Sequence, residues 1–182
     1  MALPPAVEAL WNELQAMRAD VLKEVEGLSQ PQADWRPSDK DWSIGEIIHH
    51  LTLGEMATSK LTIKLIKEAD AAGTLAPYPP DLTSFAPPPL PPGPPPGATP
   101  LVWPEKGQPI AELLAEMKAT RERSHQSIER LGSVDPRPLT WKHAATGMVM
   151  DLGHYWKMMV THDRMHLQQI RSVKASPRFP LR

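Results

Sequence analysis

Residues 161–170, with the sequence THDRMHLQQI, lie near the C-terminus in a run with helical apolar spacing. His162 and His166 are four residues apart, so a helix would project both imidazoles from one face, with their Cβ atoms about 5–6 Å apart. Neutral imidazoles are common metal ligands, and two of them on a stiff helix lose little entropy when an ion bridges them. Two ligands do not complete a site, so a third must come from another segment.

The HDRMH segment is also similar to the HExxH helix of zinc proteases. Asp163, however, stands where those proteases have their general-base glutamate. No His, Asp or Glu follows His166, so the downstream ligand of the common zincins is missing. We therefore exclude the protease class. A histidine pair with this spacing also arises often by chance, so the pair alone favours a structural role.

The composition is that of an ordinary intracellular domain. The 182 residues, 41% of them hydrophobic, can form one domain (1–182) with its own core. The 20 basic and 21 acidic side chains nearly balance, and no basic run stands out, which argues against a nucleic-acid partner. The absence of cysteine excludes disulfides and thiolate ligands. Because we find neither a signal peptide nor a membrane-spanning stretch, we expect a cytoplasmic protein that does not contact a membrane.

Apolar periodicity and capping signals predict four long helices. The second helix begins at Ser43-Ile-Gly-Glu46, a capping box in which hydroxyl and carboxylate each satisfy a free amide. The helices are expected over residues 5–28, 44–72, 109–131 and 148–173. Loops are expected over residues 31–42 and 136–147. Several charged side chains of the third helix are expected on its solvated face: Glu116, Lys118, Arg121, Glu122 and Arg123.

Prolines dominate residues 77–104, including PPP at 87–89 and 94–96. Such a segment cannot form helix or central strand and favours polyproline II, which rises about 3.1 Å per residue. Disorder and a role as an SH3-type ligand both stay open. A helix of about 28 residues is about 42 Å long, and residues 73–108 can span that distance. We therefore predict an all-α four-helix bundle in which this crossover joins the second and third helices in parallel.

Helical wheels place the candidate residues on particular faces. His50 lies at the edge of the apolar face of the second helix, whereas His49 lies nearly opposite and is expected to be solvated. His162 lies at the margin of the apolar face of the fourth helix, and His166 lies further inside. Asp163 falls in the middle of that face, so its carboxylate needs hydrogen-bond donors or a shifted pKa. It could orient a ligand histidine, or anchor a loop amide or a Trp indole.

Two short motifs, in this order and separation, resemble those of the DinB-like superfamily of four-helix-bundle metalloenzymes. One is W-S-x-x-E-x-x-x-H-L from Trp42 to Leu51, and the other is H-D-x-x-H-x-x-Q-I from His162 to Ile170. The resemblance covers nearly the whole chain. It implies a divalent metal ion held by three histidines, with water completing the coordination sphere: His50, His162 and His166. The proline-rich crossover departs from the family pattern and leaves open what covers the metal.

Zinc or nickel would suit three imidazoles best, with iron and copper also open. Some members of the superfamily look like thiol transferases or isomerases that use low-molecular-weight thiols. An open site of this kind could activate water or a small thiol for attack on an electrophilic small molecule, as in a hydrolase or an S-transferase. Glu46 could act there as acid or base, although the capping box explains it at least as well. A non-catalytic interaction module, a metal-responsive protein and a homodimer stay open as alternatives.

Overall fold

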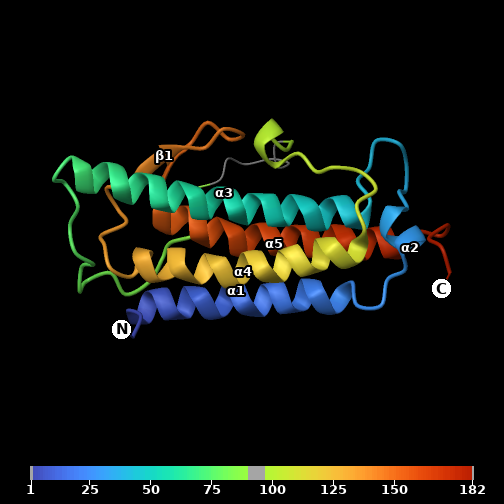
Figure 1. Ribbon diagram of the computed structural model, residues 1–182, viewed down its shortest axis with the longest axis horizontal. Coiled ribbons are helices and arrows are strands. Elements are labelled where there is room, and N and C mark those ends of the chain that lie inside the picture. The colour runs from blue at the N-terminus through green and yellow to red at the C-terminus, as the bar shows by residue number, and fades with distance from the viewer. Residues whose placement is uncertain (1, 90–96, 182) are drawn as a thin grey trace.

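The computed structural model describes residues 2–89 and 97–181, in which four long helices lie side by side (Figure 1). α3 packs against α4 and α5, while α1 packs against α5 and α4. α3 and α4 start at the same end of the bundle and run in the same direction (Figure 1). The predicted bundle, with its second and third long helices parallel, is confirmed. The long helices are α1 (Pro5–Glu24), α3 (Ile44–Ala71), α4 (Ile110–Leu131) and α5 (Leu152–Lys174).

The ends of the helices follow local capping chemistry. At the start of α3, the Glu46 backbone N–H donates to the Ser43 hydroxyl at 3.2 Å, and the Ser43 N–H donates to the Glu46 carboxylate at 2.8 Å. This is the predicted capping box. After α3, Gly73 adopts a φ of 68°, which favours glycine. Within the described parts of the chain, no helix combines the length and apolar character that a membrane span requires.

The first predicted loop contains a short helix that the sequence interpretation missed. α2 (Gln30–Asp34) follows Ser29, and the side chains of Ser29 and Gln32 form a second capping box. The available signal was the serine followed three residues later by glutamine, which is a recognised helix start. α1 ends at Glu24 rather than at residue 28, and Gly27 adopts a φ of 71°.

A hairpin spans the second predicted loop and the predicted start of the fourth helix, so the all-α prediction is wrong there. β1 (Thr140–Lys142) pairs antiparallel with β2 (Val149–Asp151), and Trp141 lies opposite Met150. α5 consequently begins at Leu152 rather than at residue 148. Asp151 caps it, because its carboxylate accepts the His154 N–H at 2.8 Å.

The described parts of the crossover lie against the bundle. Tyr78 and Phe85 pack on the core, and Pro77 forms a bridge with Val134. Residues Pro100–Val102 form a 3-10 turn, η1, that contacts α3. The prediction that this segment contains no helix is therefore wrong at η1. Pro100 is tolerated at its first position, where a backbone N–H would have no partner within the helix. The polyproline expectation for residues 94–96 lies outside the described residues.

A layer of buried charge divides the core into two apolar clusters. Arg18 of α1, Glu55 of α3, Arg121 of α4 and Asp163 of α5 are each no more than 5% exposed. Arg18 Nε donates to Asp163 Oδ2 at 3.1 Å, and Arg18 Nη2 lies 2.8 Å from Glu55 Oε2. Arg121 Nε donates to Glu55 Oε1 at 2.7 Å. We call these four side chains the ionic layer; it joins all four long helices.

The prediction that Arg121 lies on the solvated face of α4 is therefore wrong, because the side chain is buried. It lies four residues after Met117 and three before Ser124, on the same buried stripe, and it also donates to the Leu14 carbonyl oxygen of α1. Its partners are oppositely charged, so mutual attraction offsets the cost of burial. Burial raises the pKa of Asp163 against the opposing effect of Arg18. For Glu55, burial acts in the same sense, but the two guanidinium groups outweigh it and lower the pKa.

Neutralising one member of the ionic layer should destabilise the fold strongly. Glu55→Gln leaves two buried guanidinium groups facing a single carboxylate, and we expect a loss of about 3 kcal/mol in the free energy of unfolding, measured by urea denaturation. Glu68→Gln is the matched control on the same helix, because Glu68 forms an exposed pair with Lys64. That control should cost less than about 1 kcal/mol. Equal effects of the two variants would contradict a stabilising ionic layer.

Candidate metal centre

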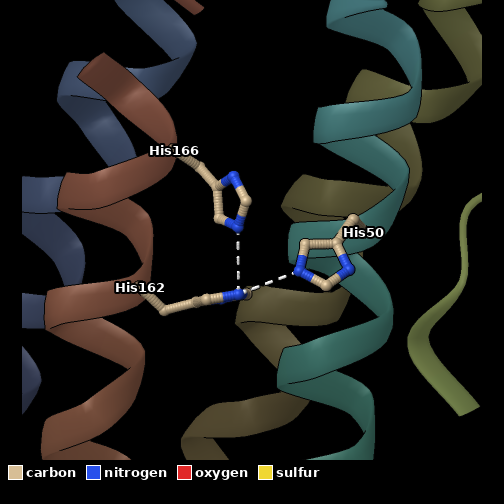
Figure 2. Close-up of side chains that lie close together, drawn as sticks. All are labelled: His50, His162 and His166. Atoms are coloured by element: carbon tan, nitrogen blue, oxygen red, sulfur yellow. Dashed lines mark hydrogen bonds between the residues drawn. The ribbon is translucent and has the colours of Figure 1, made fainter. Parts of the chain in front are cut away.

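The imidazoles of His50, His162 and His166 point toward one another between α3 and α5 (Figure 2). The Nε2 atom of His162 lies 2.9 Å from Nε2 of His50 and 3.2 Å from Nε2 of His166. One nitrogen from each ring lies within 4.8 Å of the others. The two helices therefore bring together the three histidines that the sequence singled out, and this cluster could hold a metal ion.

Hydrogen bonds on the far side of two rings determine which nitrogen faces the centre. Nδ1 of His50 lies 2.7 Å from the carbonyl oxygen of Val102, and Nδ1 of His166 lies 2.7 Å from Oε1 of Gln169. Both oxygens can only accept, so each Nδ1 carries the proton and each Nε2 presents a lone pair. Such contacts orient metal-ligating histidines. Gln169 lies one helical turn after His166, so the spacing could have predicted its contact with that ring. No sequence pattern predicts the contact between His50 and the Val102 carbonyl oxygen.

The donor set fits a cation. His162 can donate a proton from Nε2 to one neighbouring ring at most, so at least one of the other two Nε2 lone pairs has no donor within the cluster. A divalent ion would accept lone pairs from all three rings. Nitrogens that share a tetrahedral zinc ion at about 2.0–2.1 Å lie about 3.4 Å apart, close to the separations of 2.9 and 3.2 Å found here. Nδ1 of His162 is buried without a hydrogen-bond partner among the described residues.

All three rings favour the neutral form that binds metal. Burial lowers the pKa of His50, and burial together with the neighbouring imidazoles holds the pKa of His162 well below its ordinary value. Burial and His50 lower the pKa of His166 to about 4. At neutral pH an ion therefore does not have to displace protons from these rings.

Aromatic residues and the crossover enclose one side of the cluster. Trp42 lies with its ring centroid 4.8 Å from that of His50 and stacks at 6.3 Å on His166. Trp103, next to η1, meets Trp42 edge to face. His49 is only partly exposed, contrary to the prediction that it is solvated, because its Nδ1 accepts the N–H of Glu105 from the crossover. Both adjacent histidines of α3 thus hold the same segment.

The two acidic candidates have partners other than the histidines. Asp163 is buried as predicted, but its hydrogen bonds come from Arg18 rather than from a histidine, a loop amide or an indole. Asp163 directly follows His162 in the chain, so the ion pairs that hold Asp163 in the ionic layer also hold the backbone that carries His162. Glu46 is 2% exposed, caps α3 and pairs with Arg36 at 2.7 Å. This geometry favours the structural role of Glu46.

A cavity of about 900 Å³ adjoins the three histidines. Its wall includes α3, α5, the hairpin and residues 97–103. His143, which lies in the second predicted loop, is part of this wall, as is Trp141. The histidine cluster therefore has an open side that could admit a small molecule, as catalytic metal sites require.

The buried imidazoles make the stability of the metal-free protein depend on pH. Because the folded state lowers their pKa values, the unfolded chain binds protons first, and stability falls as the pH drops from about 6.5 toward 4. For His166 alone the shift from 6.5 to about 4 corresponds to about 3 kcal/mol. Urea denaturation of chelator-treated protein across this range should show a smaller pH dependence for His166→Leu. His125→Leu, at a half-buried histidine outside the cluster, should show the same pH dependence as the unchanged chain. Identical curves for all three proteins would contradict the prediction.

Comparison with known proteins agrees with this geometry. The family description "DinB superfamily" matches residues 13–170, which include all three histidines and all four members of the ionic layer. No curated protein and no solved structure matches the chain. The match covers most of the sequence and both helices that carry the three clustered histidines, and the chain therefore belongs to the DinB superfamily.

Proposed function

We propose that this protein is a metal-dependent enzyme whose divalent ion is held by His50, His162 and His166. The observation that carries the proposal is the convergence of three Nε2 atoms at the wall of a cavity large enough for an organic substrate. Zinc and nickel are the first candidates, and iron and copper also accept imidazole ligands. The proposed activity is attack of water or a low-molecular-weight thiol on an electrophilic small molecule.

A divalent ion held by the three histidines would lower the pKa of a bound water molecule or thiol, and a nucleophile would then be available at neutral pH. Residues around the site orient the imidazole rings toward the position of such an ion. Val102 and Gln169 hold the Nε2 lone pairs of two histidines toward the centre, and Trp42 restricts the rings. In either reaction the oxygen or sulfur atom would form a bond to the electrophilic carbon, and the leaving group would depart with the electrons of the broken bond.

The open side of the site favours an enzyme over a purely structural metal site. Structural zinc sites are usually closed by four protein ligands, whereas catalytic sites keep one position free. Here three ligands are at hand and the cavity adjoins them. A non-catalytic interaction module would have no need for a cavity beside the histidines, so we prefer the enzyme.

Metal analysis tests the first step of the proposal. Protein purified without a histidine tag should contain close to one equivalent of divalent metal per chain by elemental analysis, and His162→Ala should lose most of it. His125→Ala, which removes a half-buried histidine outside the cluster, is the matched control and should keep its metal. Gln169→Leu should bind metal about 10–100-fold more weakly, because His166 loses its hydrogen-bond acceptor. Unchanged metal content in His162→Ala would refute the site.

A conjugation screen tests the reaction. The metal-loaded chain is incubated with an electrophile and with bacillithiol, mycothiol or glutathione, or with water alone, and products are identified by mass spectrometry. We expect one nucleophile to give turnover that is lost in His162→Ala and kept in His125→Ala. Turnover that is equal in these two variants would show that the chemistry does not use the histidine cluster.

A further inference from the structure

The cavity beside the histidines is much larger than a water molecule requires. At about 900 Å³ it lies at the upper end of the range that accommodates drug-sized ligands. Most of its wall is aromatic or aliphatic, with side chains from the pre-α3 loop, the crossover, the hairpin and α5: Trp42, Trp103, Trp141, Tyr155, Met158 and Met159. Flat rings can stack against such a wall, and methionine adapts to irregular shapes.

Fixed charge is nearly absent from this wall. Among the described lining residues only Lys40 and Asp41 carry a full charge at neutral pH; they are adjacent, exposed and of opposite sign. No arginine lines the cavity in the described parts of the chain, so a carboxylate or phosphate inside it would lack a bidentate partner. Burying an unpaired charge is costly. Away from the histidine end, the wall therefore disfavours a charged group on the organic substrate.

One side chain supplies a directed hydrogen bond. The backbone N–H of Thr146 lies 3.2 Å from Nδ1 of His143, so Nδ1 accepts and the neutral ring carries its proton on Nε2. His143 lines the cavity, so its ring is available to a ligand there, with Nε2–H as its donor group. A carbonyl, ether or similar neutral group would satisfy it without adding charge.

We propose that this cavity binds an uncharged, mainly apolar organic molecule that contains an aromatic ring, and that this is the substrate class of the protein. The inference rests on the proposed function for one point only, which is that the histidine end of the cavity is the reacting end. The size of the cavity, its wall and its lack of charge do not depend on the metal.

Two fluorescent probes that differ by one sulfonate test the charge preference. N-phenyl-1-naphthylamine is uncharged, whereas 8-anilinonaphthalene-1-sulfonate has the same rings and an added negative charge. Titration into the chelator-treated full chain should show saturable binding of about one uncharged probe per chain. The sulfonate should bind at least about ten-fold more weakly. Equal affinities, or no saturable binding of the uncharged probe, would overturn the proposal.

A matched pair of variants tests whether the probe occupies this cavity. Met165→Glu places a carboxylate on the wall, at a side chain that is 38% exposed, and should weaken binding of the uncharged probe at least about ten-fold. Ile63→Glu makes the same change at a residue that is 37% exposed and lines a different groove, and should leave affinity within about two-fold. If circular dichroism shows that Met165→Glu is misfolded, Thr161→Glu on the same wall replaces it. Equal effects of wall and control variants would overturn the proposal.

Metal content separates this inference from the proposed function. If the chain binds the uncharged probe in the cavity but contains no metal that depends on His162, the metal-dependent enzyme is refuted and the apolar cavity stands. If it holds metal through His162 but the uncharged probe does not bind, the substrate class is refuted and the metal site stands.

Discussion

The ionic layer in the middle of the bundle determines where the histidines meet. Arg18 and Arg121 bridge Glu55 of α3 to Asp163 of α5. Packing of apolar ridges alone tolerates small shifts of one helix along another. A shift that separated these buried charges would leave them without partners, at a cost of several kcal/mol. Because Asp163 directly follows His162, the register that satisfies the charges also fixes one imidazole against its partner on α3.

Two apolar clusters on either side of this layer supply the stability that a polar centre cannot. One contains the start of α1 and the end of α3, and the other contains the end of α1 and the start of α3. Trp156 is fully buried in the first and Ile47 in the second. Hydrophobic burial at both ends thus offsets the cost of holding charges and neutral imidazoles in the middle, where a reactive site needs them.

The sequence predicted what depends on local pattern and missed what depends on contacts between distant segments. Apolar periodicity located the long helices, and the wheel separated His50 from His49. The prediction that Arg121 is solvated was wrong. A charged residue on an apolar stripe can be recognised as buried only when its partners on other helices are known. The hairpin strands are three residues each, too short for a periodic signal. The Val102 carbonyl contact joins residues 52 positions apart, and a backbone atom leaves no trace in sequence.

That contact gives the unusual crossover a physical role at the cluster. A hydrogen bond to the outward nitrogen of a histidine ligand fixes the orientation of the ring and its tautomer. Gln169 does this for His166 from within α5, but α3 supplies no equivalent for His50, and a residue of the proline-rich segment does so instead. Proline restricts the backbone around η1, so less entropy is lost when Val102 is held in place. The proline-rich crossover therefore orients the His50 ring and, through Leu101 to Trp103, forms part of the cavity wall.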